Sequence, residues 1–401
     1  TTLVPRLRFP EFRDSEGWEK SPIGAIFTLE YGSPLPEKNR TGDGFPVVGS
    51  NGVVGYHETA TVSGPAIVVG RKGSVGQINR IDEDCTPIDT TFYVVPKRPN
   101  QDTFLFIWHL LETTQLDSSG DLGAVPGLNR NSVYTIETGI PQPAEQQKIA
   151  DCLRTLDERI AAEGRKLAAL REHKKGLMQQ LFPREGKTQP RLRFPEFRDS
   201  GKWKEGRCID IAQVLTGYGF PDKYQGNMDG QYPFYKVSDI SQAVEKGCQH
   251  IWASNNYIDS DILKEIRAKP VPAGTIIFAK IGEAIRSNRR VITTKSAVID
   301  NNTAGVKAIE GKTFDDFLFY IWSNVSLIDH AGGVVPAVSK SELENVPLVY
   351  PTEPEEQHRI ADCLSALDTL IAAEEEKLDA LRTHKRGLMQ QLFPSPEDVY
   401  A

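Results

Sequence analysis

Several features that would place this chain in a special class are missing from its sequence. No stretch approaches the roughly 18 consecutive apolar residues of a membrane-spanning helix. Residues 1–13 are polar and lack the apolar core of a secretion signal. The five cysteines are widely scattered and form no C-x-x-C pair, which argues against a disulfide framework and against a zinc ribbon. We therefore expect a protein of the reducing cytoplasm.

An excess of positive charge is also missing. The 401 residues include 47 Lys and Arg against 54 Asp and Glu, a net charge of -7. This balance excludes a general basic coat for nucleic acid, but it permits a basic face on an acidic body because binding follows local charge. The length exceeds one ordinary core and predicts at least two domains. The hydrophobic content of 39% is typical of a folded chain.

The most informative feature that is present is an internal repeat. The ten residues RLRFPEFRDS occur at 6–15 and again at 191–200, an offset of 185. A longer repeat relates 148–183 to 359–394 at an offset of 211, with 26 of 36 positions identical. The second copy is therefore about 26 residues longer between its shared ends. Similar ends with divergent middles predict one scaffold that presents two different binding regions.

Each long repeat predicts a helix. Pro143 and Pro354 suit a first helical turn, and Pro183 and Pro394 end each helix. Apolar residues recur between them at the 4-3 spacing of a coiled-coil seam. The predicted seam contains Ile149, Leu153, Leu156, Ile160, Glu163, Leu167, Leu170, Lys174, Leu177 and Leu181, and then Ile360, Leu364, Leu367, Ile371, Glu374, Leu378, Leu381, Lys385, Leu388 and Leu392.

The charged seam positions predict how the two helices pair. A parallel pair would place Glu163 against Glu374, and like charges in a partly buried layer are unfavourable. An antiparallel pair centred near Leu167 and Leu381 instead places Glu163 opposite Lys385, and Lys174 opposite Glu374. We therefore predict an antiparallel coiled coil within the chain. From Ile149 to Leu181 its helix extends about 48 Å, longer than the roughly 34 Å of one DNA turn.

The variable regions, residues 20–143 and 204–353, look like mixed α/β modules. Short apolar runs bounded by Gly, Pro, Asn and Asp predict strands; they start at Phe45, Ala66, Thr91 and Gly274. Residues 103–113 and 314–324 predict one helix in each module, with an aromatic face that we expect to lie in the core. These helices match each other roughly, so both modules are expected to share a fold.

Polar loops after two strands carry the most chemistry. Residues 70–77, GRKGSVGQ, lack the G-x-x-x-x-G-K-[ST] spacing of a phosphate-binding loop, and no clear helix follows. A strand–turn–strand with projecting Arg and Lys is the better interpretation. The comparable stretch of the second module is 280–290. Residues 262–299 carry a local charge of +6 and residues 300–354 one of -5. Arg, Ser and Asn interleaved in one loop can hold phosphates or contact base edges, although charge runs are often only solvated faces.

At this point the chain resembles the specificity subunit of type I restriction–modification systems. The resemblance rests on the order of the repeats and on VPGLNRNSVYTIETGIPQPAEQQKIADCL from Val125 and VPAVSKSELENVPLVYPTEPEEQHRIADCL from Val335. GRKGSVG and the helix ends HKKGLMQQLFP and HKRGLMQQLFP also match, whereas the second module departs with AKIGEAIRS.

The resemblance implies an α+β protein with two similar mixed α/β target-recognition domains, separated by the long antiparallel coiled coil in a pseudo-twofold repeat. The expected division is 1–143 (first target-recognition domain), 144–183 (first helix), 184–190 (linker), 191–353 (second target-recognition domain), 354–394 (second helix) and 395–401 (tail). Each domain would recognise one half of a split, asymmetric sequence in double-stranded DNA, and the helices would fix the gap between the halves. They would also dock two methyltransferase subunits, which would carry S-adenosylmethionine and act on adenine N6. Restriction and motor subunits would complete the enzyme.

The expected DNA contacts come from the polar loops of both modules. In the first module they are Ser50, Asn51, Tyr56, Arg71, Lys72, Ser74, Gln77, Asn129 and Arg130. In the second they are Lys236, Ser238, Lys280, Arg286, Ser287, Asn288, Arg289, Ser339 and Lys340.

Catalytic motifs are missing. The sequence has neither an N/D-P-P-Y/F methyltransferase motif nor a phosphate-binding loop, and its seven histidines form no metal-ligand spacing. We therefore expect a subunit without catalytic residues, metal or cofactor of its own, rather than a stand-alone methyltransferase or nuclease. A coiled-coil adaptor that binds only proteins is the alternative, and salt-sensitive, sequence-specific DNA binding would exclude it.

Overall fold

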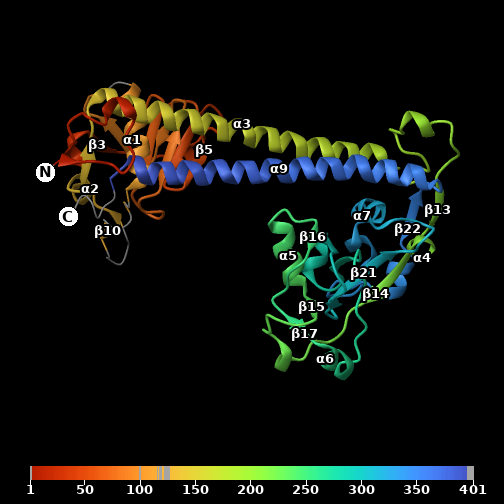
Figure 1. Cartoon of the computed structure of the whole chain (residues 1–401). Coiled ribbons are helices and arrows are strands. Elements are labelled where there is room, and N and C mark those ends of the chain that lie inside the picture. The colour runs from red at the N-terminus through yellow and green to blue at the C-terminus, as the bar shows by residue number, and fades with distance from the viewer. Residues whose placement is uncertain (1, 99–100, 115, 117–119, 122–126, 395–401) are drawn as a thin grey trace. The chain divides into compact units, whose positions relative to one another are not determined.

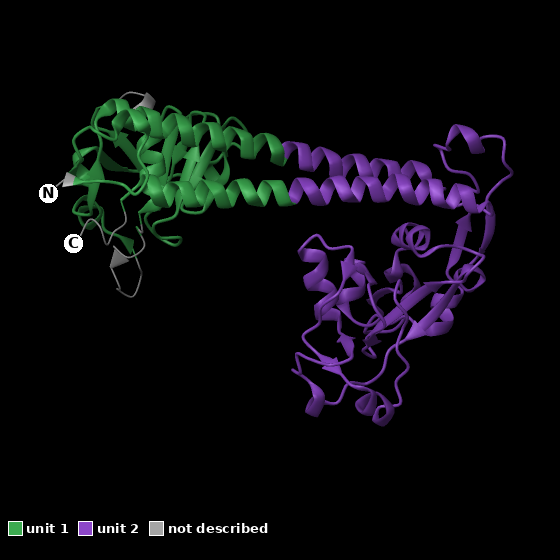
Figure 2. Ribbon diagram, in the orientation of Figure 1, with its two compact units in different colours: residues 1–164, 376–401 green, residues 165–375 purple. Residues whose placement is uncertain are grey.

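The computed structural model describes residues 2–98, 101–114, 116, 120–121 and 127–394 (Figure 1). The expected tail, 395–401, lies outside the described residues. The chain divides into two compact units (Figure 2). Unit 1 comprises Thr1–Gly164 and Glu376–Ala401, and unit 2 comprises Arg165–Glu375.

Two long helices, α3 (Pro143–Leu181) and α9 (Pro354–Leu392), begin at the predicted prolines and end just before the next ones. Each helix contributes one part to unit 1 and the other to unit 2 (Figure 2). Every side chain of the predicted seam is buried or half-buried. The ion pairs across the helices are Asp157–Lys385 (2.7 Å) and Glu163–Lys377 in unit 1, and Lys166–Glu374 (2.6 Å), Arg171–Glu375 (2.5 Å) and Lys174–Asp368 in unit 2. In both units the helices therefore pair antiparallel, as predicted.

The predicted register of this pairing is wrong by about one heptad. Glu163 pairs with Lys377, eight residues before the expected Lys385. Lys174 pairs with Asp368, six residues before the expected Glu374. A shift of one heptad keeps every leucine on the seam, so the leucine pattern does not distinguish the two registers. The charged seam residues Glu163 and Lys174 instead pair with Lys377 and Asp368, which lie beside the seam.

The elements of unit 1 follow the predicted strand and helix pattern. Its strands are β1 (Thr2–Leu3), β2 (Trp18–Pro22), β3 (Phe27–Tyr31), β4 (Phe45–Gly49), β5 (Gly52–His57), β6 (Ala66–Gly70), β7 (Ile78–Ile81), β8 (Thr86–Pro87), β9 (Thr91–Pro96), β10 (Gly120–Asp121), β11 (Gly127–Leu128) and β12 (Glu137–Ile140). Its other helices are α1 (Gln101–Thr113) and α2 (Arg130–Tyr134), with 3-10 turns η1 (Pro10–Phe12), η2 (Ile23–Ala25) and η3 (Glu37–Asn39).

Unit 2 has a similar order with additional elements. Its strands are β13 (Lys204–Arg207), β14 (Ala212–Thr216), β15 (Tyr232–Tyr235), β16 (His250–Ile251), β17 (Tyr257–Ile258), β18 (Ile276–Ala279), β19 (Arg290–Thr293), β20 (Val298–Ile299), β21 (Thr303–Ala308) and β22 (Pro347–Tyr350). Its helices are α4 (Cys208–Ile211), α5 (Val237–Glu245), α6 (Ser260–Glu265), α7 (Asp315–Ser323) and α8 (Lys340–Glu344), with 3-10 turns η5 (Pro195–Phe197), η6 (Asp222–Tyr224), η7 (Glu283–Ser287) and η8 (Leu327–His330).

The sheets show that the two modules share a fold. The order β3-β9-β6-β7 of unit 1 reappears in unit 2 as β14-β21-β18-β19, extended by β16 at the edge. The order β5-β4-β8 reappears as β17-β15-β20, in each case with one antiparallel and one parallel pair. The pair β2–β12 matches β13–β22. As the sequence predicts, α1 and α7 turn aromatic side chains into the cores.

Each module packs against the start of the long helix that follows it and against the end of the other long helix. In unit 1, Trp18 and Phe106 contact Phe393 at the end of α9, with ring centroids 6.3 and 5.6 Å apart. In unit 2, Trp203 and Phe317 contact the corresponding Phe182 at the end of α3, at 6.2 and 6.0 Å. Both repeats therefore bury the same aromatic set.

The repeated RLRFPEFRDS motif clamps these helix ends. In unit 1, Arg8 Nε and Nη2 donate to the two carboxylate oxygens of Glu145, in the first turn of α3, each at 2.7 Å. In unit 2, Arg193 makes the same two bonds to Glu356 in α9, again at 2.7 Å. Glu145 and Glu356, in the first turns of the two long helices, are thus buried anchors of an ion pair.

Backbone and surface contacts complete each clamp. The amide of Leu7 donates to the carbonyl of Gln391 in α9, and that of Leu192 to the carbonyl of Gln180 in α3. At the exposed edge, Lys148 pairs with Glu11 at 2.8 Å in unit 1, and Arg359 pairs with Glu196 at 3.2 Å in unit 2. One short motif therefore ties the start of one long helix to the end of the other.

Removing one partner of the buried clamp is expected to be costly. The side chains of Arg8 and Glu145 are only 7% and 2% exposed, so Arg8→Met leaves a buried carboxylate without its partner. We expect a loss of about 3–5 kcal/mol in the free energy of unfolding, measured by chemical denaturation. Lys148→Met is the control, because its pair with Glu11 is about half exposed and worth less than about 1 kcal/mol. Equal losses for the two variants would contradict the clamp.

Candidate nucleic-acid interface

The loop between β6 and β7 is held against a neighbouring turn in unit 1. These two strands form an antiparallel hairpin, which confirms the predicted strand–turn–strand. The backbone amides of Arg71 and Lys72 donate to the carbonyl of Thr90, at 2.9 and 3.1 Å. The hydroxyl of Ser50 donates to the same carbonyl at 2.7 Å. Three of the predicted contact residues are thus gathered around one turn.

Tyr31 brings two predicted arginines together. The guanidinium carbons of Arg71 and Arg130 lie 5.3 and 5.0 Å from the Tyr31 ring centre, within cation–π range. Arg71 Nη2 also donates to the carbonyl of Asp89 at 2.6 Å. The ring is 51% exposed, so both guanidinium groups are fixed at the surface. Sequence reasoning missed Tyr31, because a lone tyrosine at a strand end gives no pattern.

Unit 2 has the same backbone arrangement with different side chains. The amide of Lys280 donates to the carbonyl of Asn302 at 2.9 Å, and its carbonyl accepts from Val338. These bonds match those of Arg71 with Thr90 and Leu128. Lys280 therefore takes the place of Arg71. The strand pairing places Thr216 where unit 1 has Tyr31, so the stacked arrangement has no counterpart there.

A second cation in unit 2 is fixed through another loop. Lys236 Nζ donates to Gln225 Oε1 at 2.6 Å and lies 5.5 Å from the Phe220 ring centre. Lys236 also lies near Asp300, in the same turn as the Asn302 carbonyl that accepts the Lys280 amide. Burial raises the pKa of Asp300, while hydrogen bonds from Asn302 and the charge of Lys236 oppose that rise.

A repeated glycine positions these loops, and sequence reasoning missed it. Gly32 and Gly217 open segments with the common pattern G-x-x-x-P-[ED]-K, at the same offset of 185 as the clamp motif. A Cβ atom at Gly32 would lie 2.1 Å from the carbonyl oxygen of Ile88, and one at Gly217 would lie 1.8 Å from that of Asp300. Only glycine permits this approach. Extending the repeat beyond the ten identical residues would have revealed the pattern.

Several predicted contact residues have internal roles. Asn129 and Ser339 accept backbone N–H groups at the starts of α2 and α8, so they position the following Arg130 and Lys340. Asn288 donates to the carbonyl of Val325 and accepts from Arg290, and its side chain is used inside the unit.

The positive charge of 262–299 is not all at the surface, contrary to the sequence expectation. Arg290 is buried, donates to the carbonyl of Val325 at 2.6 Å, and has its pKa lowered by burial to about 9. Arg286 pairs with Glu283 at 2.9 Å, and Arg289 with Glu245 at 2.8 Å. Summing charges along a sequence ignores such partners.

Among the residues that the structure describes, no hydrogen bond or ion pair joins the other predicted contact residues into one cluster. The exposed ones are Asn51, Tyr56, Ser74, Gln77, Ser238, Ser287 and Lys340, and Lys72 and Arg286 are exposed as well.

The two modules diverge mainly in one segment. Gly32 is 38 residues before Gly70, whereas Gly217 is 62 residues before the corresponding Ala279, so 24 of the extra residues lie there. Both units keep an antiparallel pair in this segment, β4–β5 in unit 1 and β15–β17 in unit 2, and unit 2 adds α5, β16 and α6. Trp252, 59% exposed, lies in the segment of unit 2. Different surfaces are thus built on one framework.

In the part of the chain that the structure describes, neither a metal centre nor a membrane span emerges. In the described part of the chain, no group of three or more His, Cys, Asp or Glu side chains is placed to hold a metal ion. No helix among the same residues is long and apolar enough to cross a membrane.

Comparison with known proteins gives a consistent match. The family model described as "Type I restriction modification DNA specificity domain" matches residues 15–172 and 200–383. Two similar proteins of Methanocaldococcus jannaschii are the putative type I restriction enzyme MjaX specificity subunit, 23% identical over 274 residues, and the type I restriction enzyme MjaVIII specificity subunit, 20% identical over 304 residues. These matches cover 66% and 73% of this chain, and span 60% and 69% of the relatives' own lengths.

Two solved structures have a similar fold. The crystal structure of a type I restriction–modification system S subunit from M. genitalium matches with a TM-score of 0.67 at 14% identity, covering 98% of this chain and 100% of that one. A structure concerned with complex assembly and conformational transition of a type I system matches with a TM-score of 0.53 at 18% identity, covering 96% of this chain and 97% of that one.

The repeated glycine gives a test in which two neighbouring glycines are compared. Gly217→Ala forces a Cβ into the Asp300 carbonyl, whereas a Cβ at Gly219 meets nothing within 4 Å. We expect Gly217→Ala to lower the stability of the protein by more than about 2 kcal/mol, and Gly219→Ala to stay within about 1 kcal/mol. Thermal and chemical unfolding of both variants measure the difference. A Gly217→Ala protein as stable as the Gly219→Ala protein would contradict the close approach.

Proposed function

Because the chain belongs to the type I restriction–modification DNA specificity family, we propose that it is the DNA-binding specificity subunit of such a system, acting in the cytoplasm. Each module would recognise one half of a split, asymmetric sequence in double-stranded DNA. The proposal rests on one observation: the two units repeat the same framework but carry different loop surfaces. Two unlike surfaces on like scaffolds suit a site whose halves differ.

The proposed contacts in unit 1 centre on the β6–β7 loop. Arg71 and Arg130 are held at the surface by Tyr31, and a guanidinium group favours guanine at a base edge. Ser50, Asn51, Tyr56, Lys72, Ser74 and Gln77 come from the same loop or from the β4–β5 hairpin. Asn129 is kept as the residue that positions Arg130.

The proposed contacts in unit 2 follow the same framework. They are Lys236, Ser238, Lys280, Arg286, Ser287, Arg289 and Lys340, with Ser339 positioning Lys340. Asn288 is left out of this set because its amide is engaged inside the unit. Lys280 and Lys236 lie beside the turn that corresponds to the one around Thr90.

The long helices support two further parts of the proposal. Both helices contribute to both units, so their length is proposed to set the gap between the two half-sites. Their repeated sequences, identical at 26 of 36 positions, suit two copies of one partner, which we propose to be the methyltransferase subunit carrying S-adenosylmethionine. Restriction subunits would join that complex, and this chain would supply recognition without catalysis.

Replacing Arg71 tests the assignment of base contacts. We expect Arg71→Ala to remove about 1–3 kcal/mol of discrimination at one position of the half-site recognised by unit 1. Binding to a set of duplexes with single substitutions measures this effect. Lys97→Ala is the control. Thr91, at the start of β9, pairs with Gly70 beside the loop, whereas Lys97 follows the opposite end of β9. If Arg71→Ala left selectivity unchanged at every position, the assignment of Arg71 as a base contact would be wrong.

Lengthening the helices tests the spacing role. In the observed register, the bond after Gly164 lies opposite the bond after Glu375. One heptad inserted at both points lengthens the pair by roughly 10 Å and is expected to widen the gap by up to about three base pairs. Mapping methylated adenines in cells with the partner subunits measures the gap. An insertion in α3 alone should disrupt the pairing, and an unchanged gap with both insertions would refute the spacing role.

A further inference from the structure

The two long helices carry the same cations toward their ends but neutralise them differently. In α3, Arg171 pairs with Glu375 at 2.5 Å, and Lys175 pairs with Glu172 at 3.9 Å. The corresponding residues of α9 are Arg382 and Arg386. The residues that match the two acids are Gly164 and Thr383, which carry no charge. The repeat is therefore broken at the two positions that would neutralise α9.

The arginines of α9 remain largely uncompensated. Arg382 has Asp379 one turn away at 3.5 Å, and both side chains are more than half exposed. Among the residues that the structure describes, Arg386 makes no hydrogen bond or ion pair, and neither does Arg6 of the first clamp motif. Exposed pairs contribute little, and this applies equally to Lys175 and Glu172, whose side chains are 66% and 76% exposed. The helices therefore differ at Arg171, because its partner Glu375 is only 24% exposed and the position opposite Arg382 is Gly164.

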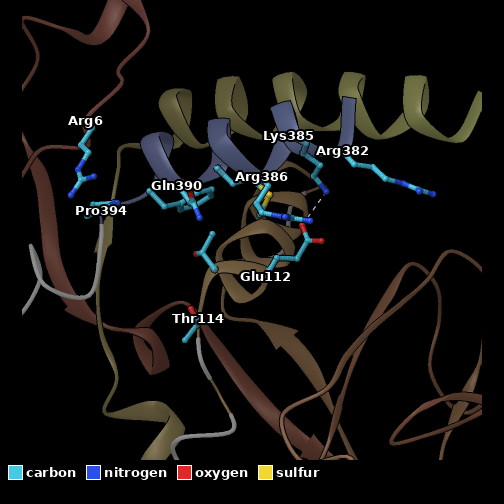
Figure 3. A pocket seen from close by; sticks show the side chains of 11 residues that line it. Arg6, Glu112, Thr114, Arg382, Lys385, Arg386, Gln390 and Pro394 are labelled. Carbon is cyan, nitrogen blue, oxygen red and sulfur yellow. Dashed lines mark hydrogen bonds and ion pairs between the residues drawn. The ribbon is translucent and has the colours of Figure 1, made fainter. Parts of the chain in front are cut away.

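These side chains line one pocket in unit 1, of about 640 Å³ (Figure 3). The end of α9 contributes Arg382, Lys385, Arg386 and Gln390, and Arg6 comes from the N-terminal segment. Glu112 of α1 is the pocket's acidic side chain and is shared with Lys385 at 3.3 Å. Lys385 also pairs with Asp157 at 2.7 Å, so the net positive charge of the pocket comes from Arg6, Arg382 and Arg386.

We propose that this pocket, the α9 pocket, binds a phosphate of the DNA backbone, a contact separate from the base contacts of the loops. Guanidinium groups match the paired oxygens of a phosphate, and the amide of Gln390 is a further donor. The inference rests on the proposed function and adds a contact that carries no sequence information.

The one-sided charge favours DNA over an acidic protein partner. A protein that docks on both repeats would meet the same residues at both helix ends, and the breaks at Gly164 and Thr383 would then give it two unequal sites. An asymmetric DNA site, in contrast, presents different phosphates to the two units. The pocket thus offers phosphate contacts at unit 1 through Arg6, Arg382 and Arg386. At unit 2 the counterpart of Arg382 is Arg171, which Glu375 neutralises.

Equilibrium DNA binding at several salt concentrations tests the pocket, with the full chain and its partner subunits. We expect Arg386→Gln and Arg6→Gln to weaken binding to the specific site and to an unrelated duplex by the same factor. The slope of log affinity against log salt should fall by about 0.9 for each lost phosphate contact. The matched pair is Arg382→Gln and Arg171→Gln, the same repeat position in α9 and α3. Arg382→Gln should lower the slope, whereas Arg171→Gln should leave it unchanged because Glu375 already neutralises Arg171.

The outcomes separate this inference from the proposed function. If Arg386→Gln and Arg6→Gln change neither affinity nor slope while the wild-type complex still prefers its site, the phosphate site is wrong and the proposed function stands. An equal loss in Arg171→Gln and Arg382→Gln overturns its one-sidedness, and a loss confined to the specific site indicates a base contact instead. Unchanged DNA binding with impaired subunit assembly assigns the pocket to an acidic protein surface. A wild-type complex without preference for any sequence contradicts the proposed function itself.

Discussion

The buried bond between an arginine of the repeated motif and a first-turn glutamate holds each unit together. Arg8 and Glu145 in unit 1, and Arg193 and Glu356 in unit 2, form the same bidentate pair. Two charges are removed from water, so the pair is stable only with this geometry and its additional acceptors. Arg8 also donates to the carbonyls of Ser15 and Glu16, and Arg193 to those of Ser200 and Gly201. Each motif is thereby folded around its own arginine and fixed to a helix start.

This clamp explains how one framework carries two different recognition surfaces. The aromatic contacts with Phe182 and Phe393, and the carboxylates of Asp157 and Asp368, anchor each module to the long helices. Asp368 accepts from Tyr320 of α7 at 2.7 Å, and Asp157 lies 3.9 Å from His109 of α1. The modules vary mainly in the segment from the repeated glycine to the end of β6 in unit 1 or of β18 in unit 2, away from these anchors. Recognition can therefore change while the anchors remain constant.

Much of the fold could be predicted because it depends on local periodicity and on exact repetition. The limits of α3 and α9, the antiparallel pairing, the strand at Ala66 and the buried aromatic helices all follow from patterns of neighbouring residues. The register could not be obtained in this way, because a heptad shift preserves the leucine seam. Asp157, Asp368 and Lys377, which decide the pairing, lie beside the seam.

The candidate site shows the same division. Arg71 and Lys72 could be named from the sequence because a hairpin turn exposes its residues. That Tyr31 joins Arg71 to Arg130, or that Asn288 and Arg290 are engaged inside unit 2, could not, since these contacts join segments far apart in the chain. The sequence by itself determined the duplication, the helices and the chemical types available for recognition. The tertiary structure decided which charges are paired, buried or left uncompensated, because each depends on partners that only folding brings within a few ångströms.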